Sequence, residues 1–166
     1  MDADSVRGPG IRSGRRKRPK IGDVVRITTP AGAAFAQYTH KHPSFGALVR
    51  VIGPANASND PAAIAGRPTQ FLAFFPLGAA CHRGIAEIVG SAPVPADLIE
   101  FPHFREPLRI FPERRERCNW RIWNGHEEWT VSDLSAEQRS YPLREIINDT
   151  LLVDRTLAGW RAIDEQ

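Results

Sequence analysis

The stretch Gln-Phe-Leu-Ala-Phe-Phe-Pro-Leu, residues 70–77, decides the fold that this sequence predicts. Six of its eight residues are apolar without helical spacing, and glycines at positions 66 and 78 lie on either side of it. A short apolar run between turn residues is typical of a strand buried on both faces in the middle of a sheet. Because Pro76 has no N–H to donate, regular pairing should end at Phe75 or at a bulge beside it.

Three β-rich segments precede this run, and short turns connect them. Residues 23–28, 34–40 and 47–52 are rich in β-branched or alternating apolar residues, and Thr-Pro-Ala-Gly and Pro-Ser-Phe-Gly separate them. Three strands with such short connections predict an antiparallel meander. Residues 53–68 contain three prolines, five alanines and no apolar run, so we expect a surface excursion there.

The second half of the chain alternates between strand and turn patterns before it becomes helical. Residues 85–89 predict a fifth strand, and the repeated prolines between positions 93 and 112 indicate an extended surface segment. Residues 120–123 and 128–131 flank Asn124-Gly125, a strong hairpin pattern. A helical element follows, with Ser140 as its N-cap; it runs to Gly159, either as one helix or as two short helices with a new start at Asn148-Asp149.

These elements predict an α+β fold. We expect residues 20–166 to form a single domain, a small, strongly curved, barrel-like antiparallel sheet closed by the C-terminal helical element. The chain of 166 residues is 42% hydrophobic and 25% charged, which is ordinary for a globular domain. It has no apolar stretch near the ~20 residues that span a bilayer, so no membrane partner is expected.

The net charge of +3 is unevenly divided along the chain. Residues 1–20 carry a net +5 and residues 21–166 a net −2. We expect residues 1–19 to be a disordered basic tail that either aids solubility or contacts nucleic acid. The remainder lacks a basic pattern with interleaved aromatic residues, so nucleic acid is not an expected partner there. No apolar region follows the basic run as in an export sequence, which predicts a cytoplasmic protein whose Cys81 and Cys118 are thiols.

No motif with a built-in mechanism is present, but several side chains are candidates for chemistry. His40 and His42 would share one face of a strand about 7 Å apart, a spacing that suits a divalent metal. The third ligand would come from elsewhere, and the alternative is an exposed pair of histidines at a strand end. Candidate third ligands are Asp23, His82, Glu87 and His103.

Arginine and tryptophan residues supply further candidates. Arg26 and Arg50 each interrupt a β-rich segment, where a guanidinium either holds a phosphoryl oxygen or lies on a solvated sheet face. Trp123 and Trp129 lie in the predicted hairpin beside carboxylates, where they form an aromatic ligand wall, a protein contact or part of the core. Cys81 precedes His82, but adjacent residues in an extended chain point to opposite faces, which disfavours a nucleophile there.

Four segments of the chain resemble the immunity protein 26 family. They are Lys-Ile-Gly-Asp-Val-Val-Arg-Ile from residue 20, Phe-Ala-Gln-Tyr from 35, Ile-Ala-Glu-Ile-Val-Gly-Ser-Ala-Pro-Val-Pro from 85, and Asn-Asp-Thr-Leu-Leu-Val-Asp-Arg-Thr-Leu-Ala-Gly-Trp from 148. The resemblance covers residues 20–161, and its branch includes a small coumaphos-hydrolysing phosphotriesterase. The matching motifs are mostly turn glycines, strand starts and a helix end.

The resemblance implies two functional expectations. The first is a hydrolase of organophosphate triesters. The family supplies no catalytic residues, so residue type and likely strand face assign the roles: His40, His42 and His82 form a base or a divalent metal site, Arg50 is the electrophile, and Trp123 or Trp129 forms an aromatic wall. The second is an immunity protein that binds and neutralises a cognate bacterial toxin.

Overall fold

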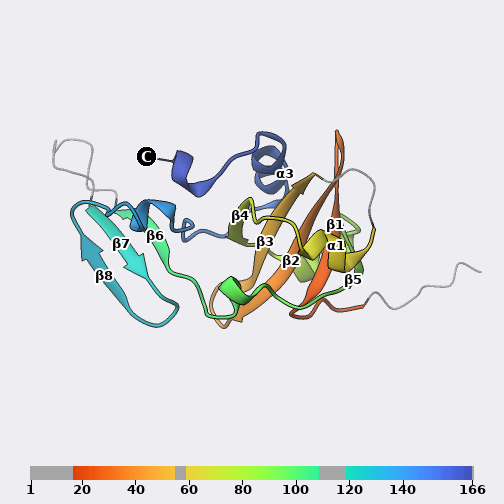
Figure 1. Ribbon diagram of the computed structural model, residues 1–166, viewed down its shortest axis with the longest axis horizontal. Helices are drawn as coiled ribbons and strands as arrows, with labels where there is room; N and C mark the ends of the chain where they lie inside the picture. Colours follow the sequence, from red (N-terminus) through yellow and green to blue (C-terminus); the bar gives the residue numbers. More distant parts are fainter. Residues whose placement is uncertain (1–16, 55–58, 109–118, 166) are drawn as a thin grey trace, which may run out of the picture.

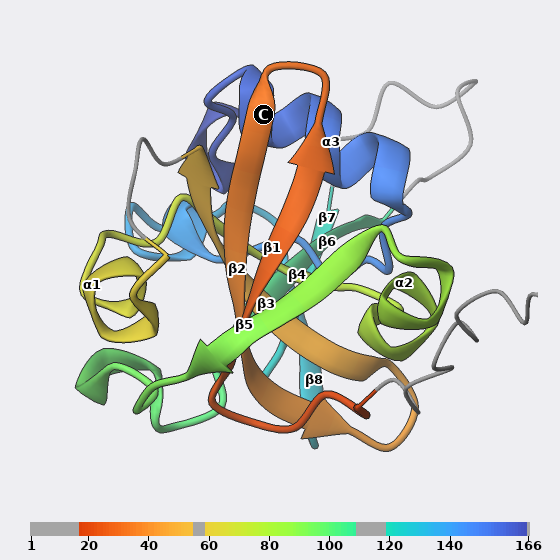
Figure 2. The same cartoon turned by 90° about the vertical axis from the view of Figure 1, so that its right-hand side faces the viewer.

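The computed structural model describes residues 17–54, 59–108 and 119–165. Strands β1 (Asp23–Thr29), β2 (Gly32–His42) and β3 (Gly46–Pro54) form the predicted antiparallel meander. Strand β4 (Phe71–Phe74) pairs with β3, and β5 (Ala86–Ser91) pairs with β1. The result is a five-stranded antiparallel sheet of order β4-β3-β2-β1-β5, seen with its covering helices in Figure 2.

The apolar run of residues 70–77 is not in the middle of the sheet, as the sequence predicted, but at its edge. Strand β4 pairs on one side only, with β3, yet Phe71, Phe74 and Phe75 are all buried. The carbonyl oxygen of Phe74 accepts the N–H of Ile147 at 2.9 Å, so a later segment covers this edge. A covered edge strand buries both of its faces, and therefore has the same sequence pattern as a central strand.

The described strands give an antiparallel α+β fold, but the large sheet is not closed. Strands β4 and β5 lie at its two edges and do not pair with each other. The barrel-like closure expected from the sequence is therefore not confirmed.

A second, three-stranded antiparallel sheet lies beside the first (Figure 1). Its strands are β6 (Phe104–Leu108), β7 (Asn119–Trp123) and β8 (Glu128–Val131), in the order β6-β7-β8. The β7–β8 hairpin at Asn124-Gly125 is confirmed. Strand β6 was not predicted, because the prolines around it indicated an extended segment outside any sheet. Its own proline, Pro107, is tolerated because β6 is an edge strand. A short 3₁₀ turn, η1 (Ala96–Leu98), precedes it.

Short helices cover the large sheet, and the sequence analysis predicted neither of the first two. Helix α1 (Pro61–Ala65) lies in the predicted excursion, and α2 (Leu77–Arg83) follows Pro76, where only a turn was expected. The C-terminal part contains η2 (Gln138–Ser140), α3 (Asp149–Leu157) and η3 (Ala162–Asp164). Among the described residues, no helix has the length and apolar character needed to cross a lipid bilayer.

The C-terminal helix begins later than Ser140. Asn148 is its N-cap, and the Asn148 side chain accepts the N–H of Leu151 at 2.8 Å. Residues 142–147 are extended instead, because their backbone groups bond to both sheets: the Arg105 N–H donates to the Pro142 carbonyl, and the Ile147 N–H donates to β4. This segment joins the two sheets, which the apolar spacing of residues 143–150 did not reveal.

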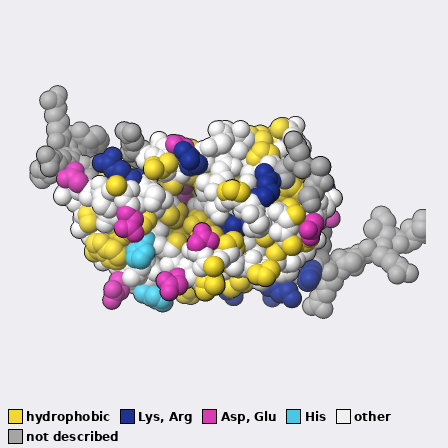
Figure 3. All heavy atoms as spheres, in the orientation of Figure 1, with side chains coloured by type: hydrophobic (Ala, Val, Ile, Leu, Met, Phe, Trp, Pro, Cys, Tyr) yellow, Lys and Arg dark blue, Asp and Glu magenta, His cyan; other side chains and the backbone are white. Residues whose placement is uncertain are grey.

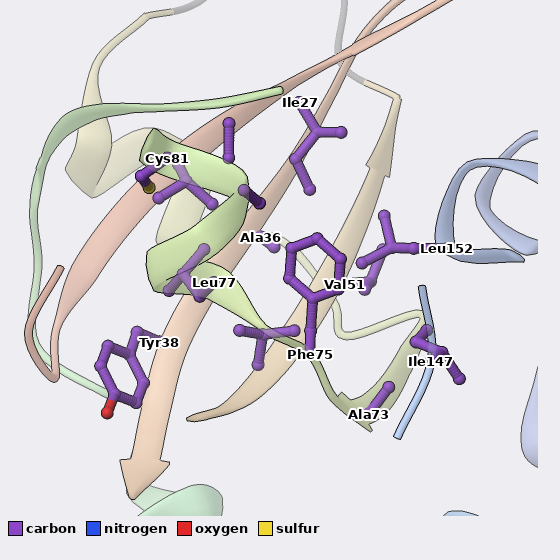
Figure 4. Packing of buried hydrophobic residues seen from close by; sticks show 14 of the residues in the cluster. Ile27, Ala36, Tyr38, Val51, Ala73, Phe75, Leu77, Cys81, Ile147 and Leu152 are labelled. Atoms are coloured by element: carbon purple, nitrogen blue, oxygen red, sulfur yellow. The ribbon is translucent and has the colours of Figure 1, made fainter. Parts of the chain in front are cut away.

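Three groups of buried side chains hold the layers together. One face of the large sheet packs against α2 and α3, and its cluster contains Tyr38, Phe75 and Leu152 (Figure 4). The other face packs partly against α1 and partly against the small sheet, where Leu48, Phe74, Phe104 and Trp123 meet. Most of the predicted basic tail and Cys118 lie outside the described residues.

Candidate functional site

The strand that carries His40 and His42 has a bulge just before them. The β2–β3 register shifts between Tyr38, which lies opposite Val49, and His40, which lies opposite Leu48. Thr39 is the extra residue, so the face on which the following side chains lie is reversed. The two histidines share a face, and that face is the one turned toward the small sheet.

Both imidazoles already have partners in the protein. His40 Nε2 is 3.2 Å from the carbonyl oxygen of Ile99, and its Nδ1 is 3.1 Å from the Thr39 hydroxyl. His42 Nε2 is 3.1 Å from the Gly125 carbonyl oxygen, and its Nδ1 accepts the N–H groups of Ser44 and Phe45 at 3.1 and 3.3 Å. These contacts hold the rings by both nitrogens, as expected for structural histidines.

The described residues do not assemble a metal site. No group of three or more His, Cys, Asp or Glu side chains in this part of the chain could hold an ion. The expected third ligands are dispersed: His82 is on α2, on the opposite face of the large sheet; Asp23 is buried in β1; Glu87 forms an ion pair with Arg26; and His103 stacks on Tyr141.

Arg50 is buried, whereas Arg26 is exposed and forms an ion pair with Glu87. The Arg50 side chain is buried, and its guanidinium donates to the carbonyl oxygens of Ala65 at 2.5 Å and Arg67 at 3.4 Å and to the Thr69 hydroxyl at 3.2 Å. Burial lowers the pKa of Arg50, and the charge of Asp97 opposes that shift. Arg50 therefore ties α1 and the loop after it to β3, and its guanidinium is held by these partners.

The two tryptophans proposed as ligand walls differ in exposure. Trp123 is 6% exposed and lies in the cluster between the two sheets. Trp129, on β8, is 40% exposed and meets the His103 ring edge-on, with ring centroids 6.0 Å apart. His103 in turn stacks on Tyr141 with centroids 5.4 Å apart. Trp129, His103 and Tyr141 form the aromatic patch.

The aromatic patch has acidic neighbours. Burial raises the pKa of Tyr141, and the charge of Glu137 and a hydrogen bond to it add to that shift, so this carboxylate is next to the phenol. On the face shown in Figure 3, hydrophobic, histidine and acidic side chains gather over the three-stranded sheet. The patch is a candidate contact surface built on a sheet.

A hollow with a volume of about 770 Å³ lies between α2 and the β2–β3 turn. We call it the α2 cavity. Apolar lining comes from the turn and from the residues after β4, and Tyr38 and Cys81 also line the cavity. Its main lining residues are Lys17, Arg18, Tyr38, Ser44, Phe45, Phe75, Leu77, Gly78, Cys81 and His82.

Sequence reasoning missed both of these sites as units. It singled out His82 and Trp129 individually, but the cavity requires α2, which was not predicted, and the patch requires Tyr141, which comes from a segment expected to begin a helix. Comparison with family models, with curated proteins and with solved structures finds no match to this chain. The resemblance to the immunity protein 26 family therefore stays a prediction.

Proposed function

We propose that this protein is a binding module of the immunity type, which neutralises a partner protein by docking through the aromatic patch. The observation that carries the proposal is the exposure of Trp129 on a regular strand. Tryptophan and tyrosine are enriched among the residues that dominate the energetics of protein interfaces. A 40% exposed Trp129, flanked by His103 and Tyr141, supplies such residues on the surface.

The strand that carries Trp129 is fixed by a network of charges. Glu128, next to Trp129, pairs with Arg144 at 2.8 Å and with Arg121 at 3.6 Å. Both arginines also pair with Glu106 on β6, at 3.0 and 3.3 Å. A contact residue held in place before binding loses less conformational freedom in the complex. The network therefore supports the patch as a docking surface.

The net charge of the protein and its expected compartment indicate which kind of partner protein it binds. Residues 21–166 have a net charge of −2, which gives little long-range steering toward a strongly basic toxin. We therefore assign the affinity to apolar and aromatic contacts and expect a partner with an apolar pocket that admits an indole. The buried Cys81 thiol suits the reducing cytoplasm, in which we place this function.

The test uses the product of any toxin-like reading frame that adjoins this gene. Binding is measured by titration calorimetry for the wild type, for Trp129→Ala and for Leu157→Ala, a control with the same 40% exposure outside the patch. We expect Trp129→Ala to weaken binding at least about 30-fold and Leu157→Ala to have little effect. Equal affinities for the two variants would contradict docking through the patch.

A second candidate, the organophosphate triester hydrolase, is supported by one observation. The α2 cavity combines apolar and aromatic walls with His82, Lys17 and Arg18, and a triester with an aryloxide leaving group needs an apolar slot and positive charge at the phosphoryl oxygen. His40, His42 and Arg50 lie elsewhere and are held by backbone groups, so His82 is the proposed catalytic residue.

The test is an assay of highly purified protein of measured metal content with a chromogenic triester, before and after chelation. Turnover that disappears in His82→Ala but not in His126→Ala supports this candidate, and turnover unchanged in His82→Ala removes it.

A further inference from the structure

The α2 cavity has features of a binding site for one class of small molecule. We propose that it binds an organic anion that combines an apolar aromatic body with a carboxylate group. This inference concerns binding alone and does not depend on either function proposed above.

The size and walls of the cavity suit an aromatic body. Its volume of about 770 Å³ lies within the range of small-molecule sites in proteins, roughly 300–1,000 Å³. Phe45, on the β2–β3 turn, and Phe75 and Leu77, after β4, provide apolar lining. These side chains also pack into the two clusters on either face of the large sheet, so the positions of the cavity walls are fixed by the core.

Tyr38 contributes a hydroxyl group to the lining of this cavity. The residue is only 7% exposed, and its ring packs in the cluster beneath α2. Figure 4 shows the Tyr38 oxygen pointing away from the other labelled side chains of that cluster. Among the described residues the hydroxyl makes no side-chain hydrogen bond, and it is not one of the buried polar atoms cut off from solvent, so it is open to a molecule in the cavity. This O–H can donate a hydrogen bond to a ligand oxygen.

The charge of the lining selects an anion. Lys17, Arg18 and His82 line the cavity, and none of its described lining residues is acidic. An O–H donor with cationic side chains around it favours an acceptor that carries negative charge, and a hydrogen bond to a charged acceptor is stronger than one to a neutral group. A carboxylate on an aromatic ring meets both requirements.

Gly78 offers a way to close the cavity without strain. It lies in α2 and lines the cavity, and a Cβ added there would meet no atom within 4 Å. A phenylalanine at this position would fill part of the open space, whereas an alanine would leave most of it. Gly78→Phe is therefore a blocking variant and Gly78→Ala its matched control.

The experiment measures binding of 2-naphthoate and of its uncharged isostere 2-naphthamide to the full chain by calorimetry. We expect the wild type to bind naphthoate at least about tenfold more tightly than the amide. Tyr38→Phe, which keeps the ring and removes the hydroxyl, should weaken naphthoate binding about tenfold, and Tyr141→Phe should not. Gly78→Phe should abolish binding, and Gly78→Ala should retain it.

The controls separate loss of binding from loss of folding. Each variant is first checked by circular dichroism and by its denaturation midpoint, and only folded variants are compared. If Tyr38→Phe fails to fold, the comparison of Gly78→Phe with Gly78→Ala decides the matter. No binding of naphthoate to the wild type, equal binding of the amide, or full affinity in Gly78→Phe would each overturn the proposal.

Discussion

The Nε2 atom of His42 lies 3.1 Å from the carbonyl oxygen of Gly125, although 83 positions separate the two residues in the chain. Because His42 Nδ1 accepts two backbone N–H groups, its hydrogen is on Nε2, and the ring donates to Gly125. The contact joins the end of β2 to the β7–β8 hairpin. The same ring lies edge-on to Trp123 with centroids 4.9 Å apart. His42 therefore connects the two sheets.

Replacing His42 by alanine should lower stability. We expect His42→Ala to reduce the free energy of unfolding by about 2–3 kcal/mol, since it removes an inter-sheet hydrogen bond and packing against Phe45 and Trp123. His126→Ala, at an exposed position of the same hairpin, should change it by less than ~0.5 kcal/mol. Urea denaturation measures both, with and without a chelator. A wild-type midpoint that falls on chelation would instead indicate a bound metal.

Two arginines with similar sequence surroundings should respond differently to the same substitution. Arg50→Met leaves the carbonyl groups of Ala65 and Arg67 without their buried donor, so we expect a loss of about 2–4 kcal/mol in the free energy of unfolding. Arg26→Met removes only an exposed ion pair with Glu87, for which a loss below ~1 kcal/mol is expected. Chemical denaturation of the two variants checks this. Comparable losses would show that Arg50 does not have the structural role assigned to it.

The sequence predicted local elements better than their arrangement. The meander and the β7–β8 hairpin were correct because short turns and residue alternation depend on neighbours in the chain. The position of β4 was wrong because residues 142–147 cover its edge, and no local pattern reveals such a distant partner. The start of α3 was misplaced for the same reason: Pro142 through Ile147 pair with the sheets instead of forming helix.

The candidate sites depended even more on tertiary structure. His40 and His42 have the residue types and spacing of metal ligands, but the carbonyl groups that occupy them, at Ile99 and Gly125, come from later segments. Tyr38 had no feature that set it apart from an ordinary strand residue. Tyr38 lines the α2 cavity only because α2 forms after Pro76, and the sequence around Pro76 predicted a turn and not a helix.

Because the Cys81 thiol is buried, we expect the stability of the protein to fall at alkaline pH. Burial and the charge of Asp23 raise its pKa in the folded protein, so the unfolded chain loses the thiol proton first. The stability contributed by this thiol is complete below the ordinary thiol pKa of about 8.5 and is lost as pH rises through the folded value. In a Cys118→Ala background, Cys81→Ala should make the fall in urea midpoint above about pH 8.5 less steep. Identical slopes with and without Cys81 would contradict this assignment.

Two glycines of α2 should give opposite results when replaced by alanine. Gly78 lies inside the helix, where a Cβ meets no atom within 4 Å, so Gly78→Ala should raise the free energy of unfolding by about 0.5–1 kcal/mol by reducing the freedom of the unfolded chain. Gly84 ends the same helix with a φ of 77°, a left-handed conformation that costs an alanine roughly 1–2 kcal/mol. Gly84→Ala should therefore lower the free energy by that amount. Thermal and urea denaturation of both variants measure the difference, and two changes of the same sign would contradict the placement of Gly78 inside α2 and of Gly84 at its end.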